Sequence, residues 1–187
     1  MNVYDFDGTI YRGDSSVDFF AFCLTRYPWL AIFLPYQIAM ILAYKLRLCS
    51  KEQEKSAYFS FLRLVPDVKS TVTAFWRKKK IKIESWYLAQ KKQDDVVISA
   101  SPAFLLLPIS EHLNIGKLIA SEVNSHTGTF ESKNCSGEEK VRRLKKLFAD
   151  ATIDSFYSDS ESDKPMAKLA QNAFKVKKGI LNKWRQQ

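Results

Sequence analysis

Two aspartates near the start of the chain, Asp5 and Asp7, have the spacing of a paired-carboxylate site. Successive side chains on an extended strand alternate between faces, so residues i and i+2 project to the same side. Gly8 then permits a tight backbone bend, and Thr9 can hydrogen-bond the local backbone. Residues 5–9 therefore form an acid pair on a loop that can approach a ligand closely, or an ordinary acidic turn after a strand.

Three further polar clusters follow predicted strands or begin a predicted helix. Residues 99–102 come directly after a buried-type strand at 96–98, and residues 158–163 come after a second such strand at 153–157. Between them, Ser136 and Glu139 have the spacing of a capping box, which places Lys140 in the first turn of a helix. The helix dipole disfavours a lysine there, and a bound phosphate would supply a reason for it.

Strands that alternate with helices predict an α/β fold with a parallel sheet and right-handed crossovers. Ligands bind such sheets beyond the carboxyl ends of the strands, where these polar clusters fall. A first helix should be capped by Ser15 or Ser16 and end near Pro28. We also expect further helical segments to about residue 93, a helix over 104–113, extended segments near 117–123 and 128–131, a helix from Pro165, a strand near 173–176 and a basic terminal helix.

The clusters, in this order, resemble the four motifs of the haloacid dehalogenase superfamily of phosphohydrolases, in its phosphoserine-phosphatase-like branch. Residues 5–9 resemble the first motif, residues 97–102 the second, Lys140 the third and residues 158–163 the fourth. The resemblance implies a Rossmann-like parallel-sheet core made of residues 1–13 and 94–187. It also implies an all-helical cap, residues 14–93, inserted between the first and second motifs.

The resemblance assigns the acids to catalysis and metal binding. Asp5 would attack phosphorus to form an aspartyl-phosphate. Asp7 would protonate the leaving oxygen and later deprotonate the water that resolves the intermediate. The implied cofactor is Mg²⁺, bound by the Asp5 carboxylate, the Asp7 backbone carbonyl and Asp159.

The remaining motif residues are assigned to the phosphoryl group. Ser99 and Lys140 would bind its oxygens, and Gly8 and Ala100 are counted with them as phosphate-binding positions. Asp163 would orient either Lys140 or a metal-bound water.

The cap departs from that of the phosphoserine enzymes, which carry a Glu nine residues after the nucleophile to meet the substrate amino group. This chain has Asp14 there, one methylene shorter. Arg63 is the nearest candidate for the cap arginine that meets the substrate carboxylate, and it lies off register. These departures argue against serine phosphate, and the apolar, basic cap looks more like that of relatives acting on phosphatidylglycerophosphate or other lipid phosphates.

Residues 27–44 are uncharged and lie between Arg26 and Lys45. The segment is shorter than the ~20 apolar residues that a membrane span needs, and Pro35 and Gln37 interrupt it. Two interpretations stay open, of which we favour the first. The segment either packs as a kinked pair of helices within a subdomain, or lies in a membrane interface with cations at the headgroups.

Charge and composition limit the partners. The formal net charge is +9, with a basic run at 77–80 and no acid after Asp163, which suits phosphate-bearing small molecules or anionic lipid. No nucleic-acid motif accompanies these cations, so a nucleic-acid partner is not expected. Three widely spaced cysteines indicate neither disulfides nor zinc. No signal-like segment opens the chain, so we expect a cytoplasmic protein, with peripheral membrane association left open.

The sequence thus predicts a Mg²⁺-dependent phosphomonoester hydrolase that acts through an aspartyl-phosphate on a small phosphometabolite or a lipid phosphate. The alternative is a catalytically idle protein of the same fold that binds an anionic partner or membrane surface. Phosphotransfer to an alcohol instead of water would use the same residues and also stays open.

Overall fold

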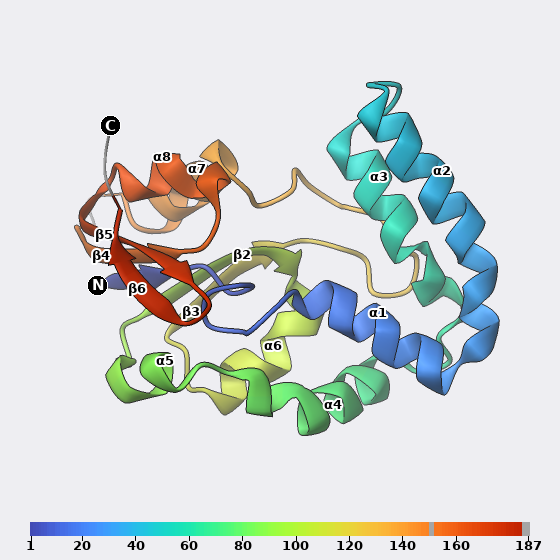
Figure 1. Ribbon diagram of the computed structural model, residues 1–187, viewed down its shortest axis with the longest axis horizontal. Coiled ribbons are helices and arrows are strands. Elements are labelled where there is room, and N and C mark those ends of the chain that lie inside the picture. The colour runs from blue at the N-terminus through green and yellow to red at the C-terminus, as the bar shows by residue number, and fades with distance from the viewer. Residues whose placement is uncertain (150–151, 185–187) are drawn as a thin grey trace.

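A six-stranded sheet forms the centre of the computed structural model, which describes residues 1–149 and 152–184 (Figure 1). The strands lie in the order β3-β2-β1-β4-β5-β6, and every neighbouring pair is parallel except β5 and β6. They are β1 (Asn2–Tyr4), β2 (Val96–Pro102), β3 (Lys117–Ser121), β4 (Ile153–Ser158), β5 (Ala170–Lys177) and β6 (Ile180–Lys183). The α/β architecture expected from the alternation of strands and helices is confirmed.

Helices cover both faces of the sheet, with α7 and α8 on one side and α4, α5 and α6 on the other (Figure 1). Between β1 and β2 come α1 (Ser15–Arg26), α2 (Leu34–Lys45), α3 (Lys51–Tyr58), α4 (Val68–Lys79) and α5 (Ser85–Gln90). Later in the chain are α6 (Ala103–His112), α7 (Glu138–Leu147) and α8 (Lys164–Ala167). Short 3₁₀ segments are Pro28–Phe33, Phe59–Leu64, Lys80–Lys82 and Glu161–Asp163.

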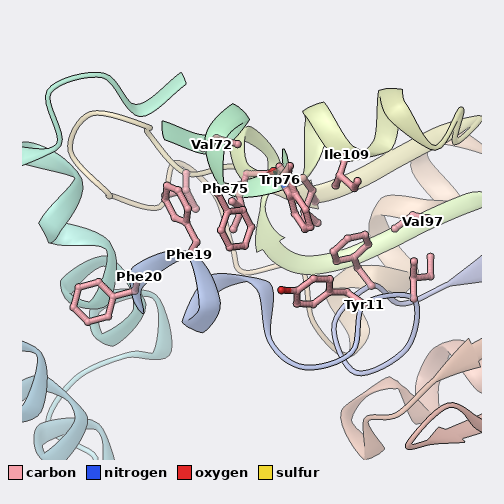
Figure 2. Close-up of a cluster of buried hydrophobic side chains, with 14 of the residues drawn as sticks. Tyr11, Phe19, Phe20, Val72, Phe75, Trp76, Val97 and Ile109 are labelled. Atoms are coloured by element: carbon pink, nitrogen blue, oxygen red, sulfur yellow. Dashed lines mark hydrogen bonds between the residues drawn. The ribbon is translucent and has the colours of Figure 1, made fainter. Parts of the chain in front are cut away.

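The core is divided by the sheet into two layers, because neighbouring residues of a strand face opposite sides. Val3 packs in the layer under α7 and α8, whereas the next residue, Tyr4, packs in the layer with α4 and α6. In that second layer, Trp76 of α4 meets the ring of Tyr11 edge-on at 5.5 Å between centroids (Figure 2), and it meets the ring of Phe6 in the same way at 5.9 Å. The aromatic contacts therefore fix the loop that follows β1.

Helices α2 and α3 extend away from the sheet as a pair, whereas α4 packs close to it (Figure 1). The Trp76 indole of α4 donates a hydrogen bond to the Leu105 carbonyl of α6 at 2.6 Å. The division into a core, residues 1–13 and 94–187, and a cap, residues 14–93, stays a prediction. Within the described residues, every helix is too short or too polar to cross a membrane.

Two predicted helix caps were wrong. Asp14, and not Ser15 or Ser16, caps α1, because its Oδ1 accepts a hydrogen bond from the Val17 N–H at 2.9 Å. The helix α7 begins at Glu138 after Gly137, with no side-chain cap. The predicted capping box at 136 and 139 does not form, because the Glu139 carboxylate is bound by two arginines one turn later on its own helix.

The prediction of a basic helix at the end of the chain was also wrong for the residues up to 184, which are the last ones described. Residues 180–183 instead form β6, which pairs antiparallel with β5. The turn between them has Lys178 at φ +52° and Gly179 at φ +76°, and two successive positive φ angles are typical of a tight β-hairpin. Residues 185–187 lie outside the described part of the chain.

Candidate active site

Asp5 lies directly after β1 and is held in place by contacts with β4 and with Lys140 of α7. Its N–H donates to the Tyr157 carbonyl of β4 at 2.8 Å. Its Oδ1 accepts from the Phe6 N–H at 2.8 Å and lies 2.9 Å from Lys140 Nζ, whereas its Oδ2 has a 3.4 Å contact with Ser158 Oγ. Burial raises the pKa of the Asp5 carboxyl to about 7, although the Lys140 ammonium opposes this. Oδ2 is thus the oxygen with the weaker bonds and the better placed to react.

Asp7 connects the first loop to α1 and β2. Its Oδ1 accepts from the Ser15 N–H at 2.6 Å, and its Oδ2 accepts from Ser101 Oγ at 2.5 Å. Burial, with the charge of Asp14 nearby, raises the pKa of Asp7 to about 6. A carboxyl group with a pKa near neutrality suits proton transfer in both directions.

Lys140 lies in the first turn of α7, where it is almost fully buried between two acids. Its Nζ is 2.6 Å from Asp163 Oδ2 and 2.9 Å from Asp5 Oδ1. Burial alone would lower the pKa of this lysine, but the carboxylates of Asp5 and Asp163 raise it, so the side chain stays charged. Ser158 Oγ also donates to Asp163 Oδ2, at 2.7 Å, and the network fixes Lys140 behind Asp5.

Asp159 follows β4 and lies against the glycine of the first loop. Its N–H donates to Thr9 Oγ1 at 3.1 Å, and its carboxylate is so close to Gly8 that an added Cβ there would lie 2.0 Å from Asp159 Oδ2. Burial, with Asp163 nearby, raises the pKa of the Asp159 carboxyl. The absence of a side chain at position 8 is therefore what lets Asp159 approach the acid pair.

We expect Gly8→Ala to destabilise the fold more than Gly137→Ala does. Both glycines have positive φ, +68° and +55°, and the strain of a side chain there costs on the order of 1–3 kcal/mol. The nearest neighbour of a Cβ at Gly137 is the Ser162 carbonyl oxygen at 3.4 Å, whereas a Cβ at Gly8 would force the Asp159 carboxylate to move, so we expect Gly8→Ala to cost about 1 kcal/mol more. Urea denaturation of the two variants measures the difference, and equal losses would contradict the close contact with Asp159.

The candidate residues meet at one cavity of about 500 Å³. Ser99 is buried within β2, which continues to Pro102 where the sequence indicated an end at residue 98, and its Oγ accepts from the Ser101 N–H at 3.1 Å. Lys140 and Asp163 do not line the cavity but lie behind Asp5. The predicted site residues that line it are Asp5, Asp7, Gly8, Asp14, Ser99, Ala100 and Asp159.

One predicted residue lies elsewhere. Arg63 lines a different cavity, beside α2 and α3, and its Nε donates to the Thr127 carbonyl at 3.3 Å. The structure therefore does not bring Arg63 to the acid pair. Asp14 does reach the cavity, although one of its carboxylate oxygens is engaged as the cap of α1.

Sequence reasoning missed the residues that α3 contributes to the cavity, Glu54, Lys55 and Tyr58. Lys55 Nζ donates to Asn134 Oδ1 at 2.9 Å, and burial lowers the pKa of this lysine. Nothing in the sequence distinguishes Lys55 from Lys51, the other lysine of the helix, because its burial depends on how α3 lies over the sheet. Ser101 was also missed as a partner of Asp7, although it belongs to the cluster at 99–102.

The carboxylates around the cavity fit a hard divalent cation. Burial raises the pKa of Asp5, Asp7 and Asp159 alike, and of the three only Asp5 has an ion pair, with Lys140, among the described residues. The buried Asp163 Oδ1 has no hydrogen-bond partner in the described part of the chain. No group of three or more His, Cys, Asp or Glu side chains among those residues could enclose a metal. Mg²⁺ commonly binds through only one or two carboxylates plus waters, so two acids and a backbone carbonyl suffice.

A second, larger groove of about 1070 Å³ adjoins the cavity and shares Gly8, Gly13 and Asp159 with it. Its lining has six cationic and three acidic side chains. Such an excess of positive charge raises the local concentration of phosphate-bearing molecules beside the acid pair. The cations are Arg12, Lys164, Lys175, Lys177, Lys178 and Lys183.

Comparisons with known proteins identify the family and the fold. A family model described as haloacid dehalogenase-like hydrolase matches residues 3–168. A search of curated proteins finds no significant match.

Several solved structures share the fold. A protein with unknown function from Bordetella pertussis Tohama I is 20% identical, with a TM-score of 0.73 over 92% of this chain and 87% of that chain. A phospho-aspartyl intermediate analogue of phosphoserine phosphatase is 17% identical, with a TM-score of 0.62 over 91% and 83%. A phosphoserine phosphohydrolase-like protein from Francisella tularensis subsp. tularensis SCHU S4 is 15% identical, with a TM-score of 0.58 over 92% and 86%.

Proposed function

Because the chain belongs to the haloacid dehalogenase-like hydrolases, we propose that it is a phosphatase that cleaves phosphomonoesters through an aspartyl-phosphate on Asp5. The observation that supports this most is the convergence of the acid pair, Ser99 and Asp159 on one cavity, with Lys140 against the back of Asp5. Uncatalysed phosphomonoester hydrolysis is among the slowest of biological reactions, so the site must supply both a positioned nucleophile and charge neutralisation.

In the first step we assign Asp5 Oδ2 as the nucleophile. A bond forms from this oxygen to phosphorus while the bond from phosphorus to the ester oxygen breaks, and the leaving oxygen takes the proton of Asp7. In the second step a water oxygen forms a bond to phosphorus while the bond from phosphorus to Asp5 Oδ2 breaks; Asp7 takes a proton from that water, and free Asp5 carboxylate and inorganic phosphate result. The Asp7 pKa of about 6 allows this carboxyl to serve as the acid and then as the base.

The phosphoryl oxygens need donors, and we assign these to Ser99 and the backbone beside Ala100, with the positive charge of Lys140 behind them. Lys140 also holds Asp5 Oδ1, so the rotation of the nucleophile is restricted and Oδ2 is presented to the substrate. Asp163 would keep Lys140 in place.

The residues that would hold Mg²⁺ are the Asp5 and Asp159 carboxylates and the Asp7 backbone carbonyl. When bound, the ion neutralises charge between the acids and the phosphate dianion. Asp159 is positioned for this by Gly8 and by its bond to Thr9.

Removal of divalent metal should abolish turnover of p-nitrophenyl phosphate. We expect wild-type protein to lose at least about 99% of its rate in EDTA and to regain it with excess Mg²⁺ but not with Ca²⁺, because Ca²⁺ takes more ligands at longer distances than Mg²⁺ does. Asp159→Ala should fail to regain activity, and the matched control Asp154→Ala, which removes an exposed aspartate at the start of β4, should regain it. Full turnover in EDTA would contradict the proposed cofactor.

The substrate class stays a phosphorylated small molecule or a lipid phosphate. The cavity receives both acidic and basic side chains from the helices, Asp14, Glu54 and Lys55, so the part of the substrate beyond the phosphate is expected to be polar near the reacting group. The basic groove alongside would attract any phosphate ester. The choice of water, and not an alcohol, as the acceptor of the phosphoryl group stays a prediction. The cytoplasmic location expected from the sequence also stays a prediction.

A catalytically idle binding protein is the alternative. Three acids with raised pKa values around one cavity argue against it, because such burial costs stability and has no use without a cation or a proton transfer. Turnover of p-nitrophenyl phosphate by the wild-type protein decides between the two.

A further inference from the structure

Helix α2 is inverted relative to an ordinary surface helix. Its one buried residue is polar: Gln37, only 3% exposed, donates from Nε2 to the Tyr58 carbonyl at 2.8 Å. Large apolar residues over much of its remaining surface are nevertheless exposed; among them Ile38 and Leu42 lie farthest around the helix from Gln37, whereas Leu34 and Ile41 adjoin it and are less exposed. We call Leu34, Ile38, Ile41 and Leu42 the α2 stripe, since their spacing of four, three and one places them on one face of the helix.

This arrangement contrasts with that of another helix of the same chain. Helix α4 has the same length and the usual arrangement, with Val72, Phe75 and Trp76 buried and Lys69 and Arg77 exposed. The sequence therefore builds ordinary amphipathic helices where they face water. An exposed apolar surface that extends over several side chains marks an interaction site in monomeric proteins.

The apolar surface continues past the end of α2. Leu46 and Leu48 are 70% and 76% exposed, and Arg47 between them has a positive φ of 60°. The aromatic residues Trp29 and Tyr44 lie near the two ends of the segment and are also more than 40% exposed. Residues 27–44 form two successive helical segments, as expected for a kinked pair, and Leu30 is buried; the expected packing is wrong only for the exposed apolar face of α2.

The charges around the stripe identify its partner. No Asp or Glu occurs between Asp18 and Glu52, while Arg26 precedes the segment and Lys45 and Arg47 follow it. Two copies of this surface would place cations against cations without a matching acid. An anionic membrane surface instead offers hydrocarbon for the stripe, phosphate for the cations and an interfacial zone for tryptophan and tyrosine.

We propose that α2, together with the turn at Leu46 to Leu48, docks on the surface of an anionic lipid bilayer. A 12-residue helix is about 18 Å long, and a bilayer core is about 30 Å thick. The helix therefore lies along the interface, with the α2 stripe in the hydrocarbon and Gln37 toward the protein.

This inference does not require that the chain be a phosphatase. It would place the cavity that contains Asp5 and Asp7, to which α3 contributes residues, on the side of a molecule bound to the membrane.

Sedimentation with vesicles tests the proposal. Wild-type protein should bind vesicles of equal parts phosphatidylcholine and phosphatidylglycerol more tightly than vesicles of phosphatidylcholine alone, and the difference should shrink as salt rises. The double variant Ile38→Ser, Leu42→Ser should bind the anionic vesicles at least about tenfold more weakly, because two large side chains no longer enter hydrocarbon. Lys45→Gln with Arg47→Gln should also lose about tenfold.

A matched control removes two exposed isoleucines from elsewhere, Ile81→Ser with Ile180→Ser, which are 82% and 65% exposed. This variant should bind vesicles as the wild type does, and all variants should keep the wild-type melting temperature and turnover of soluble p-nitrophenyl phosphate. Absence of vesicle binding by the wild type, or equal losses in the control and in Ile38→Ser, Leu42→Ser, would overturn the proposal. A dimer in analytical ultracentrifugation that the same double variant dissociates would also overturn it, in favour of a second copy as the occupant.

Discussion

Replacement of Asp5 by Asn should lower the turnover of p-nitrophenyl phosphate by more than about 10⁴-fold. The amide keeps the shape of the carboxylate, so the hydrogen bond from the Phe6 N–H and the position after β1 can persist. It has no anionic oxygen to attack phosphorus, and no covalent intermediate can form. Steady-state rates with excess Mg²⁺ measure the loss, and intact-protein mass spectrometry after rapid acid quench should detect an added phosphoryl group in the wild type alone.

The control for this experiment is Asp154→Asn, which makes the same change at an exposed aspartate that pairs with the chain's amino terminus. Its turnover should stay within about twofold of wild type, because it lies at the start of β4 and far along the strand from Asp159. Turnover of Asp5→Asn at a comparable rate would remove Asp5 from the role of nucleophile and, with it, the two-step reaction.

The convergence of the site was predictable from the sequence because parallel strands bring their carboxyl ends to one edge. Asp5 follows β1, Ser99 lies in β2 and Asp159 follows β4, and β1 lies between the other two in the sheet. Each cluster is local in sequence, and sheet order alone makes them neighbours. Lys140 joins them from the start of α7, as its place in the chain indicated.

What the sequence did not reveal depends on how helices lie in space. Burial of Lys55 at the cavity needs α3 to pass over the sheet edge, and no local pattern encodes that position. The cap of α7 was mispredicted because Glu139 finds arginines on its own helix, which compete for its carboxylate. The terminal hairpin was missed because its turn uses Lys178 at positive φ, a conformation that lysine rarely signals.

The uncharged segment is a different case, in which one pattern had two physical solutions. An apolar helix can bury its surface against the rest of the protein or in lipid, and the periodicity of its residues does not distinguish these two cases. The exposure of Ile38 and Leu42, set against the burial of Gln37, does separate them. The choice required knowing which face of α2 meets α3.

Replacement of Lys140 by Met should lower the free energy of unfolding by about 3–5 kcal/mol. Met has a similar length but no charge, so the buried carboxylates of Asp5 and Asp163 lose the ammonium that lies 2.9 and 2.6 Å from their oxygens. Urea denaturation in EDTA measures the loss without a contribution from bound metal. The control Lys146→Met, at an exposed lysine of the same helix, should stay within about 0.5 kcal/mol of wild type.

The loss caused by Lys140→Met should be larger at pH 8 than at pH 5. Burial raises the pKa of Asp5 to about 7 in the folded chain, above the ordinary value of 3.8, so the folded state binds this proton more tightly than the unfolded state does. Such a group makes the fold less stable as the pH rises through this interval. Lys140 limits that loss of stability because its ammonium stabilises the Asp5 carboxylate. At pH 5 Asp5 is protonated with or without the lysine, so the lysine matters less. At pH 8 Asp5 tends to ionise, and only the wild type has a cation that lowers the free energy of the buried carboxylate. A variant that unfolds at the wild-type urea midpoint at pH 8 would show that the buried lysine does not compensate these acids, and the assignment of Lys140 as the cation behind the nucleophile would have to be abandoned.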